Sequence, residues 1–166
     1  KHIALDPATG LWSPQPDLPI ARHHPQLVSL QGRLYCIGGF EAGERGTWLM
    51  QGDAWRFNET DQAWDWAPSL PYPNGESTAG VVNNRLYLAG GRQPLGGRNL
   101  DWNDHSDVGT LLMFDGDRWE TLAAMPTARN SAAGGVIDGR LHVVGGRTVA
   151  GGNTAVHEAY DPGTDR

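Results

Sequence analysis

Three stretches of this chain place a polar residue four positions after the first residue of a Leu-Pro or Met-Pro pair: Arg22, Asn74 and Arg129. An arginine pair suits a carboxylate ligand, because a guanidinium donates two parallel hydrogen bonds to carboxylate oxygens. In a structural alternative, each arginine caps backbone carbonyls or pairs with a neighbouring acid. Both interpretations stay open, and Asn74 interrupts a complete basic ring.

The two positions after each of these residues carry further candidates: His23 and His24, Gly75 and Glu76, Asn130 and Ser131. Catalysis of a proton transfer requires an acid and a base. Glu76 with His23, His24 or Arg129 would supply them. We therefore include His23, His24, Glu76 and Asn130 among the candidate ligand-binding residues.

Three long segments follow paired glycines, at 40–52, 92–109 and 147–154. Long loops in a compact domain are often functional. Arg92 and Arg147 begin the second and third segments and are candidate ligand-binding residues. Trp48 and Trp102 lie inside the first and second. They would form a stacking wall for a sugar or an anchor for a partner protein, or else fold back over the domain.

The segment 92–109 holds a cluster of acids and a histidine: Asp101, Asp104, His105 and Asp107. Carboxylates suit hard cations, and histidine is a borderline ligand. Their spacing matches no established metal-loop pattern, so the sequence favours a solvated loop, and we predict no metal site and no cofactor. His105 remains a candidate ligand-binding residue.

These features recur because the chain is repetitive. The second glycine of each pair is Gly39, Gly91 or Gly146, with spacings of 52 and 55 residues, and the same spacings separate Trp12, Trp64 and Trp119. A fixed period of up to about 50 residues indicates a repeat architecture. Two independent markers with one period make a chance match of glycines untenable.

Each period reads as four short antiparallel strands. The first two are joined by two-residue turns with the composition of tight hairpins: Gln31-Gly32, Asn83-Asn84 and Asp138-Gly139. Such residues tolerate the positive φ that these turns require. A third strand follows the long segment, and a fourth begins near the tryptophan. No stretch has convincing helical periodicity, so the sequence predicts an all-β fold.

The glycine pairs, the Tyr35, Tyr87 or His142 that precedes them, and the spaced tryptophans resemble the Kelch repeat along essentially the whole chain. The resemblance implies a β-propeller, with loops gathered on one face around a central channel. From the residues themselves we expect the glycines and tryptophans to be structural, with each tryptophan buried between successive blades.

The predicted units are 1–18 (the third and fourth strands of one blade), 19–70, 71–125 and 126–166 (a blade without its fourth strand). These amount to 13 strands in about three blades, half of the six-bladed ring that the resemblance implies. The spacing of Asp6 and Asn58 to their tryptophans predicts a further tryptophan directly after Arg166. The remaining blades would come from a longer chain or a second copy, and we favour the longer chain.

The composition excludes several classes of protein. The net charge of −6 and the scattered arginines argue against a nucleic-acid surface. The apolar runs are too short to cross a membrane, and we expect no secretory signal in the chain as it stands. Cys36 is the single cysteine, which rules out an internal disulfide and a multi-cysteine zinc site. The localisation stays undetermined.

We expect a binding scaffold that presents a pocket on the loop face to a protein, peptide or carbohydrate ligand. The alternative is a carbohydrate-acting enzyme, because the resemblance also extends to sialic-acid mutarotases and sugar oxidases. An oxidase is disfavoured, since Cys36 lies within a predicted strand and not beside a metal. The acidic cluster also departs from the pattern of Fe(II)-dependent specifier proteins. On balance, binding is favoured over catalysis.

Overall fold

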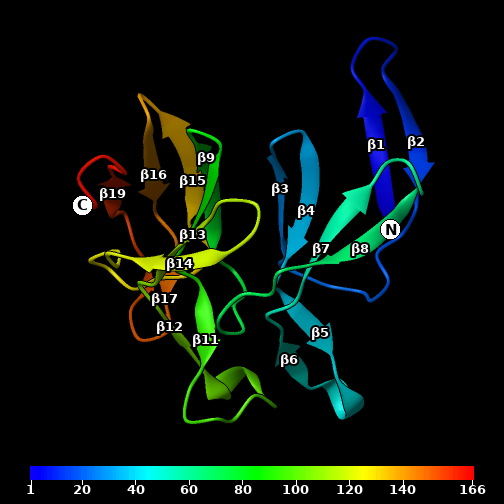
Figure 1. Ribbon diagram of the computed structural model, residues 1–166. Helices are drawn as coiled ribbons and strands as arrows, with labels where there is room; N and C mark the ends of the chain where they lie inside the picture. Colours follow the sequence, from blue (N-terminus) through cyan, green and yellow to red (C-terminus); the bar gives the residue numbers. More distant parts are fainter.

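A computed structural model describes residues 1–166, with the side chain of Arg45 left out. Its framework is one two-stranded and three larger antiparallel sheets (Figure 1). The two-stranded sheet joins β1 (His2–Asp6) and β2 (Leu11–Gln15). The first larger sheet contains β3 (Gln26–Leu30), β4 (Arg33–Ile37), β7 (Ala54–Asn58) and β8 (Ala63–Ala67).

The other two sheets repeat this order along the chain. The second contains β9 (Thr78–Val82), β10 (Arg85–Ala89), β13 (Leu111–Phe114) and β14 (Trp119–Leu122). The third contains β15 (Ala133–Ile137), β16 (Arg140–Val144) and β19 (His157–Tyr160). These sheets hold the 13 strands that the repeat predicts, and the all-β, blade-like architecture is confirmed.

The three long segments were expected as loops, but each begins with a small hairpin of its own. The added strands are β5 (Phe40–Ala42) with β6 (Trp48–Met50), β11 (Arg92–Pro94) with β12 (His105–Asp107), and β17 (Arg147–Thr148) with β18 (Gly152–Asn153). Short 3-10 turns, η1 (Glu44–Gly46) and η2 (Trp102–Asp104), lie in the first two. In the described part of the chain, no helix is long and apolar enough to span a membrane.

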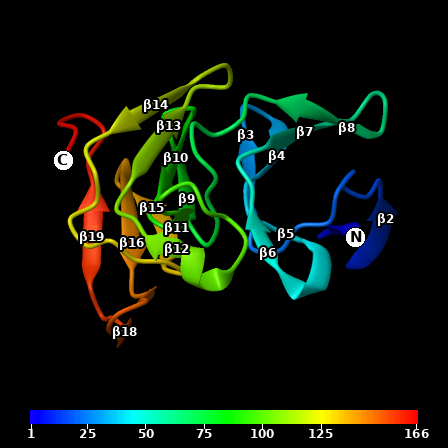
Figure 2. The ribbon, with the colours of Figure 1, turned by 90° about the horizontal axis from the view of Figure 1, so that it is seen from below.

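In Figure 2, the three larger sheets follow one another in chain order, from the sheet that contains β8 to the sheet that contains β19. Their first strands are neighbours, because β9 contacts both β3 and β15. Two kinds of segment therefore recur at one end of the sheets. They are the connections into these first strands and the hairpins that follow β4, β10 and β16. This end corresponds to the face on which the sequence analysis expected a ligand site.

Strand β10 is buried on both faces and joins two hydrophobic cores. Leu86 and Leu88 belong to the core shared with the first sheet, whereas Tyr87 and Ala89 belong to the core shared with the third. Successive side chains of a strand point to opposite faces, so one short segment contributes to both interfaces. Blade-to-blade packing thus stabilises the region that positions the loops.

The glycine pairs and turn pairs have the backbone conformations that were expected. Asn83 and Asn84 have φ of 49° and 59°, as a tight primed turn requires. Gly39 has φ of 87°, and a Cβ there would lie 2.7 Å from the carbonyl oxygen of His23. Glycine is therefore required both for its dihedral angle and for the close approach of the connecting loop.

Two of the three repeat tryptophans pack against the preceding unit, as predicted. The indole Nε1 of Trp64 donates a hydrogen bond of 3.0 Å to the carbonyl of Pro16, and the ring lies against His2 and Phe57. Trp12 departs from the expectation, because 63% of it is exposed. The described residues offer it no preceding blade to pack against.

Candidate functional site

One position of each blade combines a left-handed backbone with a polar side chain. These residues are His24, Glu76 and Ser131, with φ of 51°, 58° and 52°. The residue before each forms a bridge with the residue that follows a glycine pair: His23 with Phe40, Gly75 with Arg92, and Asn130 with Arg147. Left-handed non-glycine residues are strained, and such strain concentrates at functional sites.

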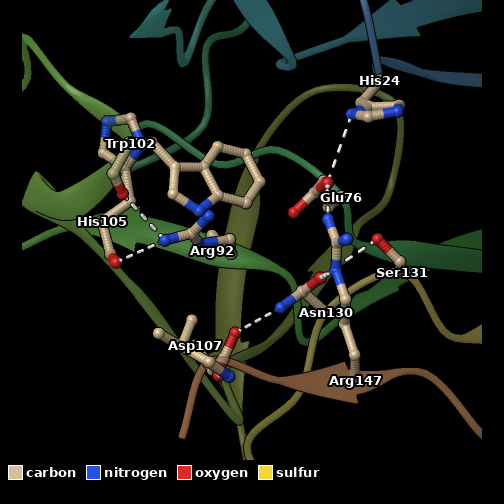
Figure 3. Close-up of polar contacts among 10 residues, drawn as sticks. His24, Glu76, Arg92, Trp102, His105, Asp107, Asn130, Ser131 and Arg147 are labelled. Carbon is tan, nitrogen blue, oxygen red and sulfur yellow. Dashed lines mark hydrogen bonds and ion pairs between the residues drawn. The ribbon is translucent and has the colours of Figure 1, made fainter. Parts of the chain in front are cut away.

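The side chains of Glu76, His24 and Arg147 meet at an open cavity, which we call the polar pocket. Glu76 Oε1 accepts a hydrogen bond of 2.7 Å from Arg147 Nη2 and lies 3.3 Å from His24 Nδ1 (Figure 3). The pocket has a volume of about 350 Å³, and its other lining residues are Ser131, Gly146 and Asn153. The carboxylate is buried, whereas 45% of the Arg147 side chain and 55% of the His24 side chain are exposed.

A chain of hydrogen bonds across two blades orients Arg147. Its Nε donates to Asn130 Oδ1 at 2.8 Å, and Asn130 Nδ2 in turn donates to Asp107 Oδ1 (Figure 3). Asp107 Oδ2 also accepts from the backbone N–H of Val149. The side chain of Asp107, from the second blade, thereby fixes the arginine of the third. The sequence marked Asn130 as a candidate but gave Asp107 no role beyond the acidic cluster.

Arg92 has the same repeat position as Arg147 but a different environment. It is fully buried, and its Nη2 donates to the carbonyls of Trp102 and His105 at 2.9 and 2.7 Å. The Trp102 ring lies over the guanidinium, with 3.6 Å between the ring centre and Cζ (Figure 3). Trp102 therefore folds back over the blade, and 36% of it remains exposed beside the pocket.

Aromatic rings continue from Trp102 toward the first blade. Phe40 stacks between Trp102 and His23, with centroid separations of 6.0 and 4.9 Å. The rings of Trp48 and His23 meet edge to face with 4.2 Å between their centroids, and 40% of Trp48 is exposed. Burial lowers the pKa of His23, and the neighbouring His24 lowers it further. The stack forms an apolar wall beside the charged residues.

The expectation that Arg22 and Arg129 form a pair for a carboxylate ligand is wrong. The Arg22 guanidinium is 1% exposed and pairs with Asp53 at 2.6 Å and with Glu41 at 3.2 Å. Arg129 is likewise buried in the third blade, where it pairs with Glu158. A buried guanidinium requires compensating acceptors, and acids of the same blade supply them, as the structural alternative proposed.

Asn74, at the equivalent position of the second blade, is also buried. Its Nδ2 donates to the carbonyl of Gly90 at 3.1 Å. The three repeat-equivalent residues thus lie beneath the site, whereas the residues two positions later line it. These lining residues therefore lie two positions along the chain from where the arginine pattern placed the ligand site.

The acidic residues of 92–109 organise the loop. Asp101 caps η2, and Asp104 accepts from the backbone N–H groups of Leu100 and Asp101, which lowers the pKa of its carboxyl. His105 Nε2 lies 2.9 Å from Asn99 Oδ1, and burial followed by the charge of Arg92 lowers its pKa. Among the residues described, no three His, Cys, Asp or Glu side chains are grouped as a metal site.

The three stacked antiparallel sheets, two with four strands and one with three, and the site at one end of their inner strands define a β-propeller. Its glycine pairs, primed turns and inter-blade tryptophans resemble those of the Kelch repeat, and the similarity to several Kelch-repeat proteins along most of the chain supports this family. The chain is 27% identical over 143 residues to Kelch-like protein terF of Aspergillus terreus, covering 84% of this chain and 30% of the relative. It is 27% identical over 159 residues to mouse Kelch-like protein 35, covering 96% and 25%.

Two further comparisons involve different kinds of protein. N-acetylneuraminate epimerase of Haemophilus influenzae is 31% identical over 72 residues, which cover 42% of this chain and 19% of the relative. The solved structure of YjhT superposes with a TM-score of 0.78 at 18% identity, over 96% of this chain and 48% of that one. No family model matches. The chain thus spans less than a third of the first curated relatives and about half of YjhT.

Proposed function

We propose that the polar pocket binds an acidic group of a protein or peptide partner, so that the chain serves as an interaction scaffold. The observation that carries the proposal is the hydrogen bonding of the Arg147 guanidinium. Its Nε and Nη2 are held by Asn130 and Glu76, whereas Nη1 has no hydrogen-bond partner among the described residues. A pre-oriented guanidinium with one free edge suits a carboxylate oxygen.

The surroundings of Arg147 support the same proposal. His24 and Asn153 border the pocket and offer further donors. The Trp102 ring, which covers the Arg92 guanidinium, also lies near Arg147. The distance between the Trp102 ring centre and Arg147 Cζ is 5.5 Å. Trp48 is partly exposed on the neighbouring hairpin. A charged centre beside exposed aromatic side chains is typical of interaction sites, and many relatives are Kelch-like proteins.

A peptide array tests the proposal. Acidic peptides that bind the protein should bind the Arg147→Ala variant about 10- to 100-fold more weakly, as the loss of one charge-assisted hydrogen bond predicts. The matched control is Arg118→Ala, because Arg118 is 79% exposed and pairs only within its own turn with Asp115. Equal binding by wild-type protein and Arg147→Ala would contradict the proposal, and so would an equal loss with Arg118→Ala.

A carbohydrate-acting function is a second candidate, and Glu76 is the observation that favours it. Its carboxylate is buried, one oxygen has no partner among the described residues, and His24 lies beside the other. A carboxylate and an imidazole could move the proton that sugar mutarotation requires. The partial likeness to N-acetylneuraminate epimerase points in the same direction.

Nuclear magnetic resonance of N-acetylneuraminate tests this candidate through the exchange between its two ring forms. The protein should accelerate the exchange over buffer, and Glu76→Gln should remove the acceleration while Arg118→Ala keeps it. If the wild-type protein leaves the exchange rate at its buffer value, the mutarotase function is excluded.

A further inference from the structure

We propose that the cavity between the second and third sheets holds the indole ring of a tryptophan on a fourth strand, which pairs with β19 and follows Arg166 in a longer chain. None of the described residues that line this cavity also lines the polar pocket, so the inference is independent of the proposed function. It gives the edge of β19 one occupant of defined chemistry.

The cavity has a volume of about 380 Å³ and lies between two blades. Leu111 borders it from the second sheet, Leu141 and Val143 from the third, and Met125 from the connection between the two sheets. These four residues belong to, or pack against, the hydrophobic core that the two sheets share. Such walls favour an aromatic ring, because aromatic side chains have a large apolar area to remove from water.

The repeat supplies a direct precedent for the occupant. Between the first and second sheets, Trp119 packs against a core that includes Leu88 and Phe114. Val143 and Tyr160 have the same repeat positions in the third sheet, and both line the cavity. The cavity therefore corresponds to the space that the Trp119 ring fills one blade earlier.

The hydrogen-bond acceptor for an indole recurs as well. Trp64 Nε1 donates to the carbonyl of Pro16 at 3.0 Å, and Trp119 Nε1 donates to the carbonyl of Pro68 at 2.9 Å. Pro16 and Pro68 share a repeat position, and the residue at this position in the next unit is Ala123. Since Ala123 lines the cavity, an indole placed there lies beside the matching carbonyl.

The backbone after β19 is turned so that a strand can return along its edge. The Asp161 N–H donates a hydrogen bond of 2.7 Å to the carbonyl of Arg166, so a hairpin turn follows β19. In this register the next residue would lie opposite Tyr160, as Trp119 lies opposite Phe114 in the second sheet. Because β19 is an edge strand of the third sheet, its outward N–H and C=O groups can pair with a further strand.

The polar groups at the cavity select an indole over other side chains. Of the two acids that line it, Glu158 pairs with Arg129. Asp165 accepts hydrogen bonds from the Tyr160 hydroxyl and from the Ala123 N–H. With these acids paired, the Ala123 carbonyl is the acceptor that precedent assigns to the ring. Phenylalanine would bring no donor to it, whereas tryptophan combines a large apolar ring with one N–H.

The test lengthens the chain by six residues that copy 119–124, Trp-Glu-Thr-Leu-Ala-Ala, directly after Arg166. Ala159 lies two residues before Asp161, so its N–H faces the same open edge of β19. Hydrogen exchange of the Ala159 amide should slow by about tenfold or more in the lengthened chain, because the amide enters a ladder. Unchanged exchange would overturn the proposal.

A matched control exchanges the first two added residues, giving Glu-Trp-Thr-Leu-Ala-Ala. The composition is the same, but the indole moves to the opposite face of the strand. This chain should protect the Ala159 amide much less, and equal protection would show that the cavity does not seat the ring. If protection in the original chain instead rises with protein concentration, a second copy covers the edge and the following strand is the wrong occupant.

Free indole probes the cavity itself. It should saturably shift the methyl resonances of Leu141 and Val143 in the original chain and leave those of Leu27, which is 59% exposed in β3, unchanged. The chain lengthened with Trp-Glu-Thr-Leu-Ala-Ala should lose this response, because its own ring occupies the space. Equal responses of the two chains, including none in either, would place the ring elsewhere and overturn the assignment.

Discussion

The indole Nε1 of Trp119 donates a hydrogen bond of 2.9 Å to the carbonyl of Pro68 in the preceding blade. The Trp119 ring also stacks on Phe114 at 4.7 Å between centroids. One side chain thus closes its own blade and ties it to its neighbour.

Replacing Trp119 with Phe should keep the stacking and remove the hydrogen bond between blades. We expect the free energy of unfolding in urea to fall by about 1 kcal/mol. Trp66→Phe is the control, since Trp66 is 67% exposed, and its effect should stay within about 0.5 kcal/mol. Equal effects of the two substitutions would show that the hydrogen bond contributes nothing.

Glycine at position 131 should stabilise the protein. The left-handed backbone of Ser131 costs roughly 1–2 kcal/mol, and glycine's extra freedom when unfolded offsets roughly 0.5–1 kcal/mol of the relief. Ser131→Gly should therefore raise the urea midpoint slightly, and Ser131→Val should lower it. Ser13→Gly, in strand β2, should be destabilising. A loss of stability in Ser131→Gly would refute backbone strain at this position.

We expect Asn99 to hold the segment 92–109 in place against the neighbouring blade. Its amide exchanges two hydrogen bonds with the backbone of Met50, accepting from the N–H at 2.9 Å and donating to the carbonyl at 2.8 Å. Asn99→Ala should therefore accelerate hydrogen exchange of the Met50 amide by about tenfold or more. Asn103→Ala serves as the control, because Asn103 bonds only to Asp101, and it should leave that amide protected.

Cys36 should make stability fall at high pH. Burial raises the pKa of its thiol from 9.0 to about 11. Between these values the unfolded chain loses the proton first, so the free energy of unfolding decreases as pH rises from about 9 toward 11. Each unit of difference corresponds to about 1.4 kcal/mol.

Urea titrations at several pH values measure this slope, and Cys36→Ala should flatten it because the titrating group is gone. The same burial predicts that a thiol reagent labels the native protein slowly at pH 8 and the unfolded protein fast. Identical slopes for wild-type protein and Cys36→Ala would remove Cys36 as the cause.

The fold was predictable from the sequence because its determinants are local. A glycine pair, a two-residue turn and a tryptophan each specify a conformation or contact that recurs at the same spacing. The small hairpins escaped prediction because β11 and β17 have only three and two residues, and their sequences vary. Nothing in residues 92–109 indicates that Asn99 attaches to Met50, since that contact depends on the neighbouring blade.

The candidate site was predicted only in part, and the partners of the arginines explain why. Arg22 and Arg129 are neutralised by acids 31 and 29 residues away, so their chemistry could not be read from their own loops. His24 and Glu76 share a repeat position, which the sequence does reveal. The sequence does not show that Arg147, which follows a glycine pair in the third blade, meets these two residues. Only the structure brings its side chain to Glu76.

The left-handed turn accepts an imidazole, a carboxylate and a hydroxyl at one repeat position, in His24, Glu76 and Ser131. Backbone geometry at this position is thus uncoupled from side-chain chemistry. A combinatorial library at these three codons would change what the face recognises while leaving the sheets and the hydrophobic cores untouched. The same property makes this chain a starting point for engineered recognition, and glycine at each position gives the reference variant without a side chain there.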